Sequence, residues 1–187
     1  MVERRTRETE VRVRLCLDGE GRGDISTGIG FFDHLLEALA CHGSMDLVVR
    51  AVGDLHVDLH HTVEDVGICL GEALRRALGE ARGIRRFASA HVPMDDALVL
   101  VAVDFGGRPY VDCRFTSKGT AGGFPLALVP EFMRAVAWKA AMNIHLEELR
   151  GRDVHHVAEA SFKALGVALR DAARADGRAL PSTKGVL

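Results

Sequence analysis

The sequence carries the motif His-His-x-x-Glu twice, at residues 60–64 (HHTVE) and 155–159 (HHVAE). Imidazole nitrogens and carboxylate oxygens are ligands that suit Mn, Zn, Fe or Ni. Where the end of a strand meets the start of a helix, adjacent side chains point in different directions, so His60 and His61 are placed to serve two different metals. Glu64 then falls in the first helical turn, from which it can reach back toward one of them.

A single motif of this kind could equally be a pair of histidines that cap a helix or hydrogen-bond in a polar cluster. The two copies, however, belong to a longer internal repeat. Aligning residues 60–78 with 155–173, a shift of 95, gives nine identities, which include both histidines, the glutamate, a Leu-Gly step and an Ala-Leu-Arg step. Two copies of one ligand set are what a pair of pseudo-symmetric metal sites requires, so the repetition favours metal binding.

Hydrophobic periodicity predicts the elements that must hold these motifs. Strands are expected at residues 11–17, 45–52, 97–105 and 144–148, helices at 31–40, 62–81, 130–141 and 157–174, and a further strand at 110–115 that forms a hairpin with 97–105. Thr62 and Asp65 resemble a helix-start capping box. The same order of elements occurs twice without a linker, which predicts one compact domain, residues 1–187, made of two repeats at about 1–92 and 93–187.

The composition excludes several classes of protein. The 187 residues carry 24 Lys and Arg against 26 Asp and Glu, a formal charge of −2, which gives no basic footprint for nucleic acid or an anionic membrane. No segment approaches the roughly 20 apolar residues of a transmembrane helix, and the first residues lack the apolar stretch of a signal peptide. The four cysteines form no Cys-x-x-Cys pair and are expected to be reduced. We therefore expect a cytoplasmic protein that binds small molecules and copies of itself.

Several stretches together resemble the imidazoleglycerol-phosphate dehydratase family in its monofunctional form. They are residues 30–34 (GFFDH), His42-Gly43, 53–65 (from Gly53-Asp54 to HHTVED), the second His-His motif and the ending 181–185 (PSTKG). The resemblance runs from about Arg5 to the C-terminus. It implies an α+β fold of two duplicated α/β halves, each a four-stranded sheet with two helices on one face, similar to domain 2 of ribosomal protein S5. It also implies a homo-oligomer, a 24-subunit shell with active sites between subunits.

The resemblance further implies two Mn²⁺ ions per subunit. The positions that match the family's metal ligands are His34, His60, His61, Glu64, His155, His156 and Glu159. Many members carry a histidine where this chain has Glu131, which follows His34 by 97 residues, so the duplication independently indicates Glu131 as the eighth ligand. A carboxylate there would favour a harder ion such as Mn²⁺. The alternative is a plain helix-start carboxylate favoured by the macrodipole.

Substrate contacts and acid/base groups follow from the same resemblance. The implied substrate-binding set is Glu8, His34, His42, His60, His61, Glu64, Arg86, Arg108, His155, Lys163, Ser182 and Lys184. Arg86 and Arg108 match phosphate- and substrate-contacting positions, and arginine gives bidentate contacts to phosphate. Glu8 and Glu159 match the family's catalytic carboxylates, and the sequence assigns neither to a particular step. Without the resemblance, Glu8 is an exposed charge before a strand and each cation is a solvated surface residue.

The family reaction is the dehydration of D-erythro-imidazole-glycerol phosphate to imidazole-acetol phosphate in L-histidine biosynthesis. No carbonyl acidifies the hydrogen that is removed, so the resemblance implies two metals that bind the ring nitrogens and stabilise an imidazolate, which expels the hydroxyl to give a diazafulvene-like intermediate. Two rival functions use some of the same residues. A dinuclear metallohydrolase would explain the histidines and arginines, and a non-catalytic metal-binding protein would explain the histidines alone.

Overall fold

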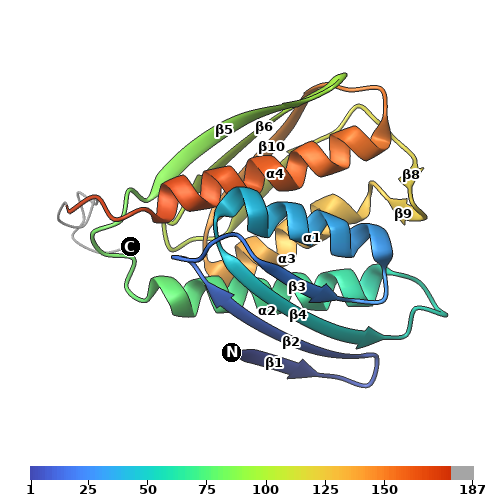
Figure 1. Cartoon of the computed structure of the whole chain (residues 1–187), viewed down its shortest axis with the longest axis horizontal. Helices are drawn as coiled ribbons and strands as arrows, with labels where there is room; N and C mark the ends of the chain where they lie inside the picture. Colours follow the sequence, from blue (N-terminus) through green and yellow to red (C-terminus); the bar gives the residue numbers. More distant parts are fainter. Residues whose placement is uncertain (178–187) are drawn as a thin grey trace.

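Two four-stranded sheets form the outside of the molecule, and four helices lie between them (Figure 1). The computed structural model describes residues 1–177. In chain order the elements are β1 (Val2–Arg5), β2 (Thr9–Cys16), β3 (Gly23–Ser26), α1 (Gly30–Gly43), β4 (Asp46–Gly53), α2 (His60–Leu78), β5 (Phe87–Met94), β6 (Ala97–Asp104), β7 (Tyr110–Arg114), β8 (Thr120–Ala121), β9 (Phe124–Pro125), α3 (Leu128–Ala140), β10 (Asn143–Arg150) and α4 (Val154–Ala173). Within residues 1–177 no helix is long and apolar enough to cross a membrane.

The two sheets have the same topology. Their strand orders are β1-β2-β4-β3 and β5-β6-β10-β7, and in each the last strand runs parallel to its neighbour while the other pairs are antiparallel. Helices α1 and α2 accompany the first sheet, and α3 and α4 the second. The expected fold of two duplicated α/β halves is thereby confirmed. The expected boundary between residues 92 and 93 falls inside β5, which pairs along its whole length with β6 of the second sheet.

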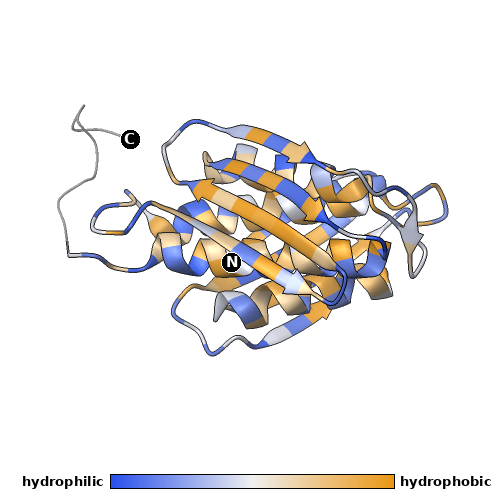
Figure 2. Ribbon diagram, turned by 90° about the horizontal axis from the view of Figure 1, so that it is seen from above, coloured by the Kyte–Doolittle hydropathy of each residue, from blue (hydrophilic) through white to orange (hydrophobic). Residues whose placement is uncertain are grey.

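Alternating side chains give each strand one buried face. In β2, Val11 and Val13 are buried whereas Arg12 and Arg14 are exposed, and Figure 2 shows this alternation of apolar and polar residues along the strands. The buried faces pack on the helices, α2 on β2 and α4 on β5 and β6. Burial of this surface on both sides of the helix layer produces one continuous hydrophobic core that spans both halves.

Helices of opposite halves pack in pairs, α1 with α4 and α2 with α3. A glycine permits each close approach: a Cβ on Gly166 of α4 would lie 2.6 Å from the Leu39 carbonyl oxygen, and one on Gly71 of α2 would lie 2.4 Å from the Val136 carbonyl oxygen. Gly71 and Gly166 are partners in the 95-residue repeat. The repeated glycine therefore permits close packing of the two halves in two equivalent places, one between α1 and α4 and one between α2 and α3.

A cluster of phenylalanine rings joins α1, α3 and α4 near the end at which they begin. Phe32 of α1 lies with its ring centroid 5.5 Å from that of Phe132 in α3, and Phe132 stacks on Phe162 of α4 at 5.0 Å. Phe124 stacks on the other side of Phe32 at 5.6 Å. All four rings are buried. This cluster fixes the positions of the nearby first turns, from which the candidate ligands extend.

Two local expectations were wrong. Residues 97–105 and 110–115 do not form a hairpin, because β10 lies between β6 and β7 and pairs with both. The glycines and proline at 106–109 resemble a tight hairpin turn. They lead instead into β7, which is separated from β6 by β10. Five further strands, β1, β3, β5, β8 and β9, were missed, since they are short, polar or carry weak alternation.

The Thr62 and Asp65 capping box is also absent. The Asp65 carboxylate turns inward, where it accepts hydrogen bonds from Arg4 and from the Thr9 hydroxyl. Helix α2 instead starts at His60, whose backbone N–H donates to Asp58 Oδ1 at 2.7 Å. The equivalent residue of the repeat does the same, because Asp153 Oδ1 accepts from the His155 N–H at 2.8 Å and starts α4 at Val154. Both His-His pairs thus lie in the first helical turn.

Candidate metal centre

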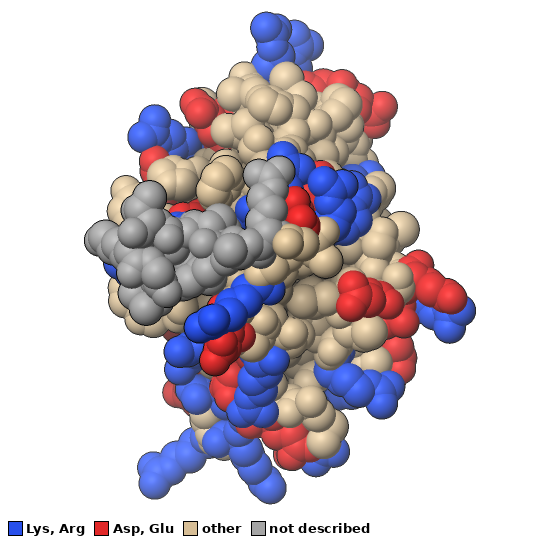
Figure 3. Space-filling model, turned by 90° about the vertical axis from the view of Figure 1, so that its left-hand side faces the viewer, with Lys and Arg blue, Asp and Glu red and all other residues tan. Residues whose placement is uncertain are grey.

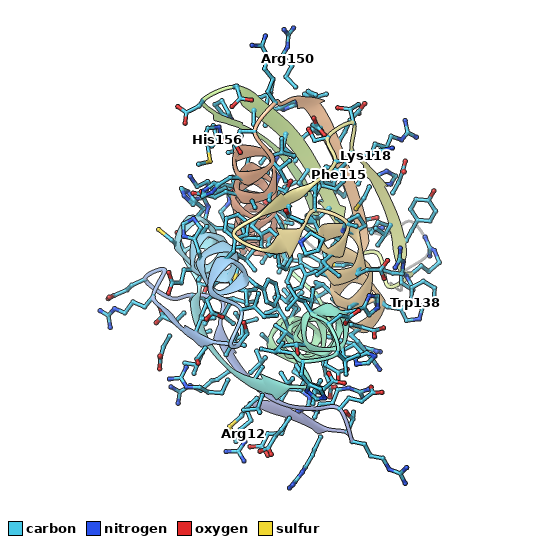
Figure 4. The ribbon with its side chains drawn as sticks, turned by 90° about the vertical axis from the view of Figure 1, so that its right-hand side faces the viewer. Arg12, Phe115, Lys118, Trp138, Arg150 and His156 are labelled. Carbon is cyan, nitrogen blue, oxygen red and sulfur yellow. The ribbon has the colours of Figure 1, made fainter. Side chains whose placement is uncertain are left out.

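All four helices begin at the same end of the molecule, on the right in Figure 1. The residues implied as metal ligands lie in or near their first turns: His34 in α1, His60, His61 and Glu64 in α2, Glu131 in α3, and His155, His156 and Glu159 in α4. The partial positive charge of helix N-termini favours carboxylates in such places. Figure 4 looks onto this end, with His156 at the start of α4 and Trp138 pointing outward from α3.

Three of these residues form a group that could hold a metal ion. His34 Nε2 and His155 Nε2 lie 3.0 and 3.1 Å from Glu159 Oε2, and the three donor atoms are all within 4.8 Å of one another. Glu159 is only 7% exposed, whereas both histidine side chains are about half exposed. We call His34, His155 and Glu159 the α1/α4 half-site. Among the residues that the structure describes, it is the only such group of three.

Charge keeps the Glu159 carboxylate ionised. Burial acts to raise its pKa, but hydrogen bonds from Lys163 and His34 outweigh burial and lower the pKa to about 2. Lys163 Nζ lies 2.8 Å from Glu159 Oε1, so the two carboxylate oxygens face different partners, a cation on one side and the two imidazoles on the other. Glu159 is therefore an anion at neutral pH, as both a metal ligand and a proton acceptor must be.

Lys163 and His42 continue this line of polar groups along the α1 and α4 contact. Burial and the nearby charge of Lys163 lower the pKa of His42, which favours its neutral imidazole. The ring of Phe31 packs edge-on against His155 with centroids 4.9 Å apart, so one side of the half-site is apolar. The arrangement presents neutral imidazole, cation and carboxylate in sequence, which can orient a polar ligand along the helix pair.

The internal repeat places a second set at the α2/α3 contact. Shifts of 97 and 95 residues match His34 with Glu131, and His155 and Glu159 with His60 and Glu64. Glu64 and Glu131 line one cavity of about 260 Å³, together with Ile68, Arg134, Ala135, Trp138 and Lys139. We call His60, Glu64 and Glu131 the α2/α3 half-site. Its donor atoms do not converge as those of the α1/α4 half-site do, because Glu131 is ion-paired with Arg134 on its own helix.

The second histidine of each pair points away from the first. The rings of His60 and His61 are 6.3 Å apart at an interplanar angle of 85°, and those of His155 and His156 are 5.9 Å apart at 76°. The two rings of each pair therefore point in different directions, as expected from their place at a helix start. His61 Nδ1 contacts both oxygens of Asp54, at 3.0 and 3.2 Å. His156 Nδ1 contacts Asp96 Oδ1 at 2.6 Å.

Glu8 is also near this end of the molecule. Its Oε2 lies 3.8 Å from His61 Nδ1, and its backbone carbonyl accepts from the Asp54 N–H. The hydrogen bond with Asp54, with help from the charge of Glu8, raises the pKa of His61. Glu8 thus shares a neighbourhood with His61, whereas Glu159 belongs to the α1/α4 half-site. Within one chain, the two implied catalytic carboxylates belong to different groups.

Arg86 and Arg108 are not near either half-site. The Arg86 N–H donates to the Ala172 carbonyl near the end of α4, 13 residues beyond Glu159. At a rise of about 1.5 Å per helical residue, this separation is roughly 20 Å. Arg108 is at the same end, since its carbonyl accepts from Asn143 at the start of β10. Figure 3 faces this end and shows Lys and Arg side chains on it. Ser182 and Lys184 lie outside the described residues.

Asp104 holds Arg86 in place. The guanidinium donates from Nε to Oδ1 at 2.7 Å and from Nη2 to Oδ2 at 3.2 Å, and the Arg86 side chain is only 16% exposed.

The Arg86–Asp104 pair was not predicted from the sequence, and neither were the contacts of Asp54, Asp96 and Arg134. Asp54 was named only within the stretch that carries the family resemblance, without a role of its own. His56, His91 and His145 are exposed and belong to neither half-site.

The fold and the half-sites together define a class of protein: a duplicated α+β protein whose helix N-termini carry paired histidine and glutamate sets of the kind that could hold a metal ion. Comparison with known proteins gives the family. A family profile described as Imidazoleglycerol-phosphate dehydratase matches residues 27–169. Proteins of that name from Moorella thermoacetica and Azorhizobium caulinodans are 52% and 53% identical to the chain, covering 100% of it and 97% and 96% of their own lengths.

Solved structures agree. The crystal structure of the Pyrococcus furiosus enzyme has a TM-score of 0.88 at 42% identity, with 100% of both chains covered. That of the Staphylococcus aureus enzyme has a TM-score of 0.79 at 34% identity, covering 91% of this chain and 96% of that one. The chain belongs to the imidazoleglycerol-phosphate dehydratase family. It is accordingly a hydro-lyase, a dehydratase of histidine biosynthesis.

Proposed function

We propose that the chain dehydrates imidazoleglycerol phosphate to imidazole-acetol phosphate with two Mn²⁺ ions per subunit, in active sites that two or more subunits complete together. The observation that carries the proposal is the convergence of His34, His155 and Glu159 on one point. Two imidazoles and a buried, ionised carboxylate are a donor set for a first-row divalent metal, and neither a helix cap nor a surface cluster requires it.

The residues present fit the implied metal. Each half-site combines nitrogen and oxygen donors, and Glu131 adds an oxygen donor to the α2/α3 half-site, which suits Mn²⁺ better than the softer metals. When bound, the ions would supply Lewis acidity at the nitrogens of the substrate ring. The exposed histidines supply donor atoms at the surface, where ring and ion can meet. Glu131 enters this proposal as the eighth ligand, and it would have to leave Arg134 to act as one.

Glu159 and Glu8 are proposed as the proton-transfer residues. Glu159 is ionised and largely shielded from water, so it can accept the proton of the substrate carbon without competition from solvent. Lys163 stabilises this anion from the Oε1 side and, with His42, orients the polar chain of the substrate along α1 and α4. Glu8, beside His61, is proposed to transfer a proton to or from the leaving hydroxyl group or the enol.

The phosphate group is proposed to bind Arg86 and Arg108, with Ser182 and Lys184 of the C-terminal segment. These arginines lie roughly 20 Å from the half-site of their own chain, farther than the short substrate can reach. The separation supports active sites that form between subunits, in which the arginines come from another copy. A closed homo-oligomer such as the implied 24-subunit shell meets this requirement. The implied substrate contacts of His34, His60, His61, Glu64 and His155 would then lie on the opposite side of the shared site.

The decisive experiment is an assay of imidazoleglycerol phosphate dehydration by protein stripped of metal and then supplied with Mn²⁺. Dehydration that appears only with Mn²⁺ supports the proposal. Release of inorganic phosphate instead would indicate the metallohydrolase, and tight metal binding with neither reaction would indicate a non-catalytic metal protein. The expected cytoplasmic location stays a prediction, to be checked by cell fractionation.

A further inference from the structure

Each His-His pair contributes one histidine whose Nδ1 faces an aspartate. His61 Nδ1 lies between the two oxygens of Asp54, and His156 Nδ1 lies 2.6 Å from Asp96 Oδ1. In both cases the aspartate comes from outside the helix that carries the histidine. Asp54 directly follows β4, and Asp96 lies in the turn between β5 and β6.

The duplication does not account for this correspondence. A shift of 95 residues carries His61 onto His156, but the shift of 97 that matches β4 with β10 carries Asp54 onto Gly151, which has no carboxylate. The two aspartates thus contact the same atom of equivalent histidines, although they occupy unrelated positions in the two halves. A contact merely inherited from the common repeat would have used equivalent residues. The independent arrival indicates that an acceptor at Nδ1 is required there.

Backbone hydrogen bonds hold the carboxylate of Asp96 and the main chain of Asp54. Asp96 Oδ2 accepts from the N–H groups of Arg152 and Asp153, at 2.5 and 3.1 Å, directly before α4 begins. Asp54 donates its backbone N–H to the Glu8 carbonyl and accepts from the Val57 N–H at 2.7 Å. The Asp96 carboxylate is therefore a fixed acceptor for His156, and the anchored main chain of Asp54 keeps its carboxylate beside His61.

The chemical consequence concerns the tautomer of the ring. A carboxylate at Nδ1 requires a proton on Nδ1, which leaves the lone pair on Nε2 free in the neutral imidazole. Such a carboxylate also makes the imidazole a stronger donor, and in known metal sites its removal typically costs about 10–100-fold in metal affinity. An amide in its place can present its NH₂ group to Nδ1 and so stabilise the wrong tautomer.

We infer that Asp54 and Asp96 are positioning residues that hold His61 and His156 with Nε2 ready to bind a divalent metal, one aspartate for each half of the repeat. The inference rests on the proposed metal binding and deepens it. It assigns these two carboxylates a part in building the metal centres without contact with the metal or with the substrate.

The test measures Mn²⁺ affinity in the full-length protein by competition with a chromophoric chelator. Asp54→Asn and Asp96→Asn should each weaken binding at one of the two sites by about 10–100-fold. The melting temperature of the metal-free protein should change little, because the aspartate backbone contacts remain. Asp112→Asn is the matched control: its carboxylate is 30% exposed, close to the 32% of Asp96, but it pairs with Arg114 and not with a histidine. The control should bind Mn²⁺ as the parent does.

A double-mutant cycle separates positioning from a general structural effect. If Asp54 acts through His61, Asp54→Asn should have no further effect on Mn²⁺ affinity in a His61→Ala background, and likewise for Asp96 with His156→Ala. Parent-like affinity in both single variants, or the same loss with and without the histidine, would overturn the inference. If Asp54→Asn does not fold, the Asp96 cycle decides alone. Failure of the parent to bind Mn²⁺ would instead overturn the proposed metal centre.

Discussion

His34 Nε2 lies 3.0 Å from Glu159 Oε2, although His34 belongs to the first half of the chain and Glu159 to the second. Neither half could therefore build the α1/α4 half-site alone. Each helix of the first half packs against a helix of the second, α1 against α4 and α2 against α3. The duplicated halves thus supply two related half-sites only when packed together.

The metal content should be two ions per chain, because the repeat supplies two ligand sets. Elemental analysis of protein purified with Mn²⁺ and without added zinc measures the ratio. Glu131→Ala should lower the ratio and the activity together, since it removes an oxygen donor from the α2/α3 half-site. A fully active protein with one ion per chain would contradict the prediction. Unchanged metal content in Glu131→Ala would return that residue to a helix-start carboxylate paired with Arg134.

Glu159→Gln should lower the turnover number by roughly 10²–10⁴-fold, the usual contribution of a positioned acid or base. The amide keeps the shape of the side chain but loses its basicity. Substrate affinity should change much less, because the metals and phosphate contacts dominate it. Metal content is the control, since loss of an ion would imitate loss of a base. Near-parent turnover with both ions retained would transfer the role to Glu8.

Removal of metal should weaken the oligomer. The half-site histidines are partly exposed where subunits are proposed to meet, and without ions the interface would lose the metal–ligand bonds that help to hold it together. Light scattering before and after chelation, with metal loss verified, measures particle size. Restoration of the original size by Mn²⁺ is expected. A metal-free particle of the same size would show that the interfaces hold by other contacts.

Gly166→Ala should destabilise the protein, because the added Cβ would lie 2.6 Å from the Leu39 carbonyl oxygen. Such overpacking typically costs about 1–3 kcal/mol. It also separates α1 from α4, so Mn²⁺ affinity should fall with stability. Gly30→Ala is the matched control, because no atom lies within 4 Å of the Cβ it would add. Thermal unfolding and chelator competition on both variants check the prediction, which an equally stable Gly166→Ala protein would contradict.

The duplicated fold, and the position of the His-His-x-x-Glu motifs at helix starts, could be predicted from the sequence because they depend on local spacing. The identity of each residue's distant partner could not. Asp54 and Asp96 share no place in the repeat, so no alignment of the halves relates them. The false hairpin has a similar cause: a Gly-Gly-Arg-Pro turn fits both a hairpin and a step over a neighbouring strand, and only the burial of β10 between β6 and β7 decides between them. Periodicity located the helices to within a few residues. Helices α2 and α4 begin earlier than expected, because Asp58 and Asp153 accept hydrogen bonds from backbone N–H groups of their first turns.

The separation of Arg86 from the half-sites of its own chain has a genetic consequence. If the proposed roles hold, an Arg86→Ala chain lacks the phosphate-binding end of the site and a His155→Ala chain lacks the metal-binding end, so each alone should be inactive. In a mixed particle, some sites would join the intact end of one chain to the intact end of the other. Co-expression or reassembly of the two defective proteins should therefore restore part of the activity. A protein with self-contained sites could not show such complementation, because every chain in the mixture would carry its own defect.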